Sequence, residues 1–255
     1  MRLVVRCGAA VFGSAALLGA AASRADHLDQ TTYESRTVLY YKVDDANLQK
    51  LLPAGWKPIT FDSGPAKGAN LVINISEQFA ALGTDGKAAG DRRGRGVTLS
   101  ARVADPATGT PRAMVMFGFS TGVDVPGPYG THQRGLIYMT RSARSDSSET
   151  LVEESWRAVD AAGDEMKLDF AYARGSTALS HVDQQTRSSV HPDFYRIYKI
   201  DAVADVVRSE NLNIDHLRRF SFTATGRVSE LADDTKQLIA IVSVPIYERH
   251  IWLPE

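Results

Sequence analysis

A loop rich in proline and glycine holds the side chains of this chain that are best suited to chemistry. Residues 121–135 read T-G-V-D-V-P-G-P-Y-G-T-H-Q-R-G, which brings Tyr129, His132 and Arg134 close together. They offer a hydroxyl group, a base that titrates near neutral pH and a fixed positive charge. Such a set can hold a carboxylate or a carbonyl group and move a proton, with His132 as the catalytic group and the other two as ligand-binding groups. The simpler alternative is that each side chain satisfies only backbone groups of its own loop.

The segments that must position this loop are predicted to be β-strands. Residues 97–104 and 112–120 alternate between apolar and polar side chains on either side of a D-P-A-T-G turn, which is typical of a hairpin. Residues 136–141, after the loop, are again apolar and alternating. A constrained loop between such strands is a common place for binding groups.

A second hairpin and several shorter runs complete the predicted sheet. Residues 151–175 alternate about a glycine-containing turn, which places Met166, Leu168, Phe170 and Tyr172 on one face. Further strands are expected at 69–75, 193–200, 219–227 and 235–244, with a polar leader at 26–35, a loop at 181–192 and a helical turn at 202–207. Roughly nine or ten strands and few short helices predict a mostly antiparallel β fold, a sandwich or a closed barrel. We expect one domain, residues 26–255.

In residues 38–58 the hydrophobic pattern changes from that of a strand to that of a short helix, which ends at a proline. Residues 38–43 alternate as a strand, and Asp44 or Asp45 can cap a following helix by accepting from its free backbone N–H groups. Three leucines then follow at helical spacing. Pro53 cannot continue that helix, and the P-A-G turn directs Trp56 back towards whatever the helix packs on.

The first residues have the pattern of a secretory signal peptide. Arg2 and Arg6 precede an apolar run of small residues, and S-R-A at its end predicts cleavage near Ala25. We therefore expect residues 1–25 to be removed and the protein to be periplasmic or secreted. The run is shorter than the roughly 20 residues of a spanning helix, so no membrane anchor is expected. Cys7, the single cysteine, lies in this segment, which leaves the mature chain without a thiol.

Charge and motif content exclude several classes of function. Removing three arginines from the 29 basic residues leaves 26 against 30 acidic residues, a net charge of −4, which argues against a nucleic-acid partner. The six histidines form no pair at i, i+2 or i, i+4, so no metal site is predicted. There is no dinucleotide or P-loop pattern, and no cofactor is expected.

The strand, short helix and turn of residues 38–58 resemble a signature of a known superfamily. The strand end Y-Y-K-V-D at 40–44, the short helix and L-L-P-A-G at 51–55 resemble the N-terminal signature of the acetoacetate decarboxylase superfamily. I-S-E at 75–77 is similar to the Y-x-E segment of that superfamily, and the hairpin about Gly163 is compatible with it. The resemblance implies an antiparallel conical β-barrel with few short helices and an apolar pocket inside.

The same resemblance sets expectations about the site. Family decarboxylases form a Schiff base through a lysine in a Pro-Lys-Lys context, whereas this chain has no Lys-Lys pair. We therefore expect no Schiff-base chemistry. The resemblance implies Glu77 as a catalytic pocket carboxylate, with a surface glutamate as the alternative, and Arg36 as a group that binds a substrate carboxylate. Tyr172 of the second hairpin joins the ligand-binding candidates.

Three hypotheses of function follow from these observations. The first is an exported β-barrel protein that binds a small organic acid or carbonyl compound. The second is a lyase or isomerase without an imine, which uses Glu77 or His132 for acid–base chemistry. The third is a lipocalin-like carrier, for which the match of residues 38–58 would be accidental. A small-molecule ligand is expected in each case, and a homo-oligomer is left open.

Overall fold

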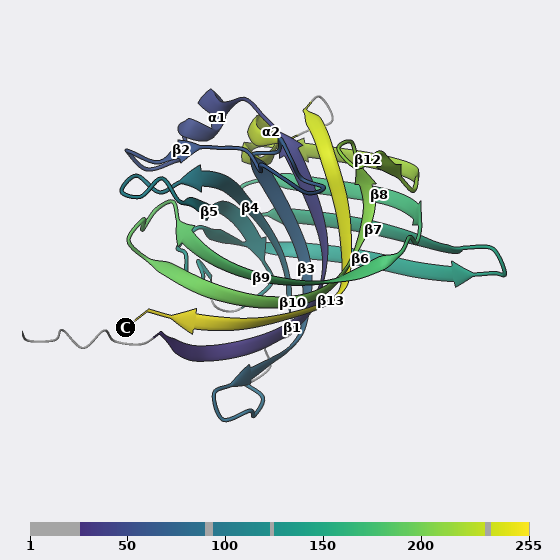
Figure 1. Ribbon diagram of the computed structural model, residues 1–255, viewed down its shortest axis with the longest axis horizontal. Helices are drawn as coiled ribbons and strands as arrows, with labels where there is room; N and C mark the ends of the chain where they lie inside the picture. Colours follow the sequence, from purple (N-terminus) through teal and green to yellow (C-terminus); the bar gives the residue numbers. More distant parts are fainter. Residues whose placement is uncertain (1–25, 90–93, 123–124, 233–235, 255) are drawn as a thin grey trace, which may run out of the picture.

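The structure is a computed structural model that describes residues 26–89, 94–122, 125–232 and 236–254 (Figure 1). The predicted signal peptide lies outside these residues. Within them the fold is mostly β, as the sequence predicts, with two five-residue helices, α1 (Asp45–Gln49) and α2 (Arg227–Leu231). None of the helices in the described ranges is long and apolar enough to cross a membrane.

Thirteen strands form one sheet. They are β1 (His27–Lys42), β2 (Lys57–Pro58), β3 (Leu71–Gly83), β4 (Gly94–Ala104), β5 (Pro111–Ser120), β6 (His132–Ser145), β7 (Thr150–Asp160), β8 (Glu165–Ala173), β9 (Thr177–Ser188), β10 (Tyr195–Ser209), β11 (Ile214–Asp215), β12 (Leu217–Thr225) and β13 (Gln237–Leu253).

Seven of these strands close into a ring. The order β5-β9-β10-β13-β1-β3-β4 returns to β5, because β4 and β5 also pair. Strands β6, β7, β8 and β12 continue from β5 as a second layer (Figure 1). Most pairs are antiparallel, and the pairs that β5 makes with β6 and with β9 are parallel. The two predicted hairpins, β4–β5 and β7–β8, are confirmed.

Three segments differ from the sequence-based predictions because backbone pairing, not apolar alternation, holds them. The expected polar leader at 26–35 is the first half of β1 and pairs with both β13 and β3. The expected loop at 181–192 is largely β9, whose first seven side chains are exposed and therefore carry no apolar pattern. The expected helical turn at 202–207 is the middle of β10, which pairs with β9 and β13.

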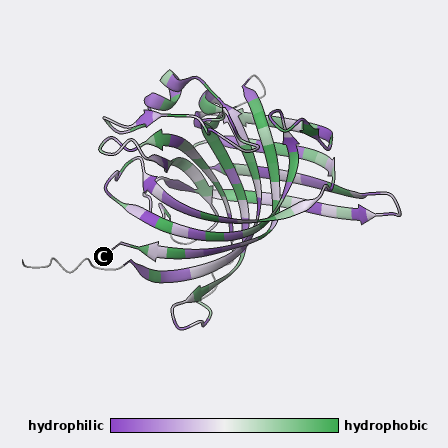
Figure 2. Cartoon of the chain, in the orientation of Figure 1, coloured by the Kyte–Doolittle hydropathy of each residue, from purple (hydrophilic) through white to green (hydrophobic). Residues whose placement is uncertain are grey.

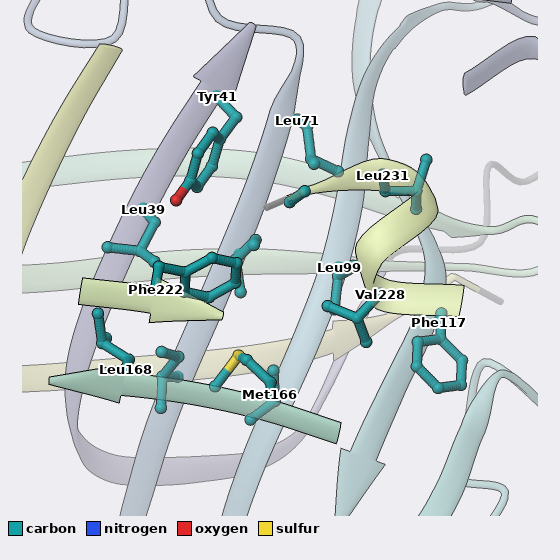
Figure 3. Close-up of a cluster of buried hydrophobic side chains, with 14 of the residues drawn as sticks. Leu39, Tyr41, Leu71, Leu99, Phe117, Met166, Leu168, Phe222, Val228 and Leu231 are labelled. Atoms are coloured by element: carbon teal, nitrogen blue, oxygen red, sulfur yellow. The ribbon is translucent and has the colours of Figure 1, made fainter. Parts of the chain in front are cut away.

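Alternation along the ring strands separates two apolar clusters. Leu39 belongs to the larger cluster, between the ring and the second layer, whereas its neighbour Val38 belongs to the cluster on the other face of the ring. Figure 3 shows Leu39 and Leu99 of the ring facing Met166 and Leu168 of the second layer. Hydrophobic and hydrophilic residues alternate along many strands in Figure 2. The ring therefore has one side packed against a layer and a separate interior.

The unit after β1 folds as predicted, with one difference. The Asp44 side chain caps α1 by accepting from the backbone N–H of Ala46 at 2.6 Å. Gly55 turns the chain with a φ of 86°, and Trp56 is buried in the larger cluster. The difference is that α1 ends at Gln49, so Leu51 lies beyond the helix and is 42% exposed. This unit follows the C-terminal end of β1, whereas the cavity described below is lined by side chains between positions 30 and 36 of that strand.

Candidate functional site

A cavity of about 370 Å³ lies inside the ring of seven strands. Every ring strand contributes side chains to the cavity wall. This is expected, because every second side chain of a strand points to the same face of the sheet. One lining residue from each strand, in chain order, is Arg36, Ser76, Thr98, Val115, Thr186, Tyr198 and Arg249. The apolar pocket that the resemblance implies is thus a mixed cavity, because charged side chains are buried in its wall.

A buried carboxylate with two arginines forms the centre of the wall. Glu34 on β1 is 2% exposed as a side chain and accepts from Arg36 Nε and Nη2 at 2.9 and 2.7 Å. Arg249 on β13 donates through Nη2 to the other carboxylate oxygen at 2.7 Å. Thr32 donates to that same oxygen at 2.8 Å. The three ionised side chains carry one net positive charge in an enclosed space, which favours an anionic ligand.

The pKa values of these groups show how strongly they are coupled. Burial alone would raise the pKa of Glu34, but the charges of Arg249 and Arg36 outweigh it and lower the pKa from 4.5 to about 2. Burial would likewise lower the pKa of Arg249, but the Glu34 carboxylate raises it above its usual value. Glu34 and Arg249 are therefore both ionised at neutral pH.

Tyrosine rings support the two guanidinium groups. The guanidinium carbon of Arg36 lies 3.7 Å from the centre of the Tyr247 ring, and that of Arg249 lies 4.8 Å from the Tyr198 ring. The hydroxyl groups of Tyr198 and Tyr129 share a short hydrogen bond. Burial and the neighbouring Tyr198 hydroxyl raise the pKa of Tyr129, so Tyr129 stays protonated at neutral pH. The arginine side chains are consequently held in place on the wall.

His132 faces the cavity as a neutral imidazole. Its Nε2 is 3.0 Å from Thr98 Oγ1, and burial lowers its pKa from 6.5 to about 4. The ring packs over Gly118, where an added Cβ would lie 2.6 Å from the imidazole and 2.5 Å from the carbonyl oxygen of Val97. A side chain at position 118 is therefore incompatible with this place for His132.

No lysine is among the residues of the cavity wall in the described part of the chain. Lys199, on β10 between two inward-facing residues, points to the outer side of the ring and lies over the Trp252 ring at 4.4 Å. The described residues also contain no group of three or more histidine, cysteine, aspartate or glutamate side chains that could hold a metal ion.

The structure brings together three of the six side chains that the sequence suggested. Arg36, Tyr129 and His132 all line the cavity. The other three lie elsewhere, because alternation along β3 turns Glu77 away from the cavity, whereas Arg134 and Tyr172 lie on the second-layer strands β6 and β8. Glu77 is ion-paired with Arg95 at 3.1 Å, Arg134 is exposed on β6, and Tyr172 is buried outside the ring, stacked on Phe170.

Sequence reasoning missed the residues with which Arg36 acts. Glu34 lies in the predicted polar leader and Tyr198 in a predicted strand. Tyr247 and Arg249 follow the last predicted strand, residues 235–244. A signal was present in the E-S-R of β1, because residues at i and i+2 of a strand share one face. It is visible only once that segment is recognised as a strand.

Solved structures with a similar fold belong to the acetoacetate decarboxylase-like class. The enduracididine biosynthesis enzyme MppR complexed with pyruvate has a TM-score of 0.56 and 12% identity, over 93% of this chain and 92% of that chain. MppR with the condensation product of pyruvate and imidazole 4-carboxaldehyde has a TM-score of 0.53 and 12% identity, over 98% and 97%. An acetoacetate decarboxylase-like enzyme from Sphingomonas wittichii RW1 has a TM-score of 0.51 and 14% identity, over 89% and 92%.

No protein-family model and no curated protein matches the sequence. At the identities of the solved structures, the likeness is one of fold. The chain therefore has an acetoacetate decarboxylase-like fold, as the resemblance of residues 38–58 predicted.

Proposed function

We propose that this protein is exported and binds a small organic acid or carbonyl compound in the cavity inside the ring, without Schiff-base chemistry. The observation that supports this most directly is the enclosed positive charge of Arg36 and Arg249 about a single carboxylate, Glu34. A carboxylate ligand can accept from guanidinium groups that tyrosine rings already hold in place. The neutral imidazole of His132 then offers a hydrogen bond to a carbonyl group.

The absence of lysine from the described wall favours binding without an imine. The similar structure of MppR complexed with pyruvate supports a 2-oxo acid as the first ligand to test. Export is supported by the signal-peptide pattern of residues 1–25, and sequencing the N-terminus of the protein purified from a periplasmic fraction tests it. A mature chain that still begins at Met1 would contradict export.

Isothermal titration with pyruvate at pH 7 tests the binding site. Replacing Arg36 by methionine is expected to weaken binding about tenfold, because a charge-assisted hydrogen bond contributes roughly 1.5–3 kcal/mol. Arg144→Gln removes a positive charge from an exposed position, 76% exposed as a side chain, and serves as the matched control with unchanged binding. If pyruvate and other small carboxylic acids fail to bind the wild-type protein, the proposal is wrong.

The enzymatic alternative is a lyase or isomerase in which His132 moves a proton. His132 supports this alternative because it faces the cavity. Glu77 does not line the cavity, although its neighbours Ser76 and Gln78 do. A pKa of about 4 makes His132 a weak base, and a bound carboxylate would raise that pKa by stabilising the imidazolium.

A comparison of binding with turnover separates carrier from enzyme. For an enzyme, His132→Ala is expected to retain ligand binding and to lose turnover by about a hundredfold or more. Glu77→Ala, outside the cavity, is expected to change turnover little. Treatment with borohydride and a β-keto acid should leave no covalent adduct, and an adduct would show that a lysine takes part after all.

A further inference from the structure

An outer cavity of about 600 Å³ adjoins the inner one. Asp29 and Gln30 of β1, Gly83 at the end of β3 and residues 125–128 contribute to its wall. Four residues line both cavities, namely Gln30, Gly127, Pro128 and Arg196. A ligand that fills the inner cavity can therefore extend past these residues into the outer one.

Arg196 is the charged residue among these four, and its ion pair with Asp29 is long. Its side chain is 16% exposed, and its Nε is buried without a hydrogen-bond partner among the described residues. Its Nη2 meets Asp29 at 3.6 Å, which is longer than a hydrogen bond. Because the Arg196 side chain keeps some exposure in the wall of both cavities, its guanidinium group can donate to an acid group that a ligand brings there.

The strand geometry explains why Asp29 is an incomplete partner. Asp29 falls at a register shift of the β1–β13 pairing, between Leu28 and Gln30, where an irregularity re-aims the side chain. The carboxylate remains 35% exposed and therefore hydrated. Asp29 thus neutralises the charge of Arg196 only in part, and Arg196 remains available for a stronger acceptor.

The spacing of the positive charges indicates the size of the ligand. Arg196 and Tyr198 face the same side of β10 and are separated by about 7 Å along the strand. The guanidinium group of Arg249 lies over the Tyr198 ring, so it belongs to the inner position. One small carboxylate cannot bridge such a distance, whereas two acid groups at the ends of a short carbon chain can.

We propose that Arg196 binds a second acid group, so that the preferred ligand is a dicarboxylate with several carbon atoms between its acid groups. One carboxylate lies in the inner cavity with Arg36 and Arg249, and the other reaches Arg196 at the junction. This proposal rests on the proposed function and deepens it, because it names the class of acid that the site selects.

Titration of the mature chain with adipate and with hexanoate, which differ by one terminal carboxylate, tests the proposal. The wild-type protein is expected to bind adipate at least about tenfold more tightly than hexanoate at pH 7. Arg196→Gln is expected to abolish that preference and leave hexanoate binding nearly unchanged. Arg144→Gln, which changes the net charge equally, should preserve the preference.

Replacing Asp29 by asparagine is expected to raise the affinity for adipate, which is the opposite of the effect of Arg196→Gln. It removes the carboxylate that competes for Arg196, so adipate should bind several-fold more tightly while hexanoate changes less than about twofold. A merely structural Asp29–Arg196 pair would instead weaken both acids in both variants. If Arg196→Gln does not fold, the wild-type preference and the Asp29→Asn result decide the question.

The outcomes distinguish this proposal from the one on which it rests. Binding of both acids with equal affinity, unaffected by either substitution, would overturn the role of Arg196 and leave the inner site in place. Failure of both acids and of pyruvate to bind would overturn the proposed function itself.

Discussion

Replacing Glu34 by glutamine is expected to lower the free energy of unfolding by about 3 kcal/mol at pH 7. The substitution keeps the size of the side chain but removes the one negative charge that Arg36 and Arg249 share inside the ring. Two buried guanidinium groups would then repel each other without a counter-charge. Urea unfolding followed by tryptophan fluorescence measures the change, with Glu149→Gln, an exposed ion-paired glutamate, as the control that should stay near wild type.

The same cluster predicts a pH dependence of stability. The folded-state pKa of Glu34, about 2, lies below the unfolded value near 4.5. Its contribution is therefore complete above about pH 4.5 and is lost as the pH falls towards 2, in total about 3 kcal/mol. Glu34→Gln should flatten the unfolding free energy in that window. A variant with the same steep loss as the wild type would show that Glu34 is not its cause.

A buried ion cluster is weak evidence for selection on stability. Replacing all three charged residues, as Glu34→Leu with Arg36→Met and Arg249→Met, is expected to recover most of the stability that Glu34→Gln loses. Retaining a costly cluster makes physical sense if its free positive charge binds a ligand. The triple variant should therefore be stable and unable to bind pyruvate.

How far the sequence predicts this molecule depends on which interactions hold each segment. The β4–β5 and β7–β8 hairpins and the α1 unit are predictable because apolar alternation, turn residues and a capping aspartate act locally. Strand β9 is not, because its exposed side chains carry no pattern and its place depends on the ladder with β10. The first half of β1 cannot be recognised from the sequence for a related reason. Its buried side chains are polar, and the charged groups that they contact are distant in the chain.

The candidate site divides in the same way. His132 and Tyr129 are found from a local cluster in one loop, and Arg36 from a resemblance in sequence. The partners Glu34 and Arg249 are more than two hundred residues apart along the chain, so only the β1–β13 pairing brings them together. Glu77 lies just beyond the strand predicted at residues 69–75, which continues to Gly83 in the structure. The face that Glu77 occupies depends on the register of that strand.

The second large effect is expected from His132 in mild acid. Its pKa is about 4 in the folded protein and near 6.5 in the unfolded chain, so the unfolded chain binds the proton first as the pH falls. The stability that it contributes is complete above about pH 6.5 and declines towards pH 4, by up to about 3 kcal/mol. This window lies mostly above that of Glu34, and the two losses can be measured separately.

Replacing His132 by glutamine should remove the loss between pH 6.5 and 4, because the amide stays neutral and can still bond to Thr98. His181→Gln is the matched control. His181 is exposed, and its hydrogen bond with Asp201 raises its pKa, so its removal should leave the acidic loss intact. Bound pyruvate should shift the His132 titration to higher pH, because an adjacent carboxylate stabilises the imidazolium. A His132 signal that titrates near 6.5 by NMR in the ligand-free protein would contradict both its burial and its place in the cavity wall.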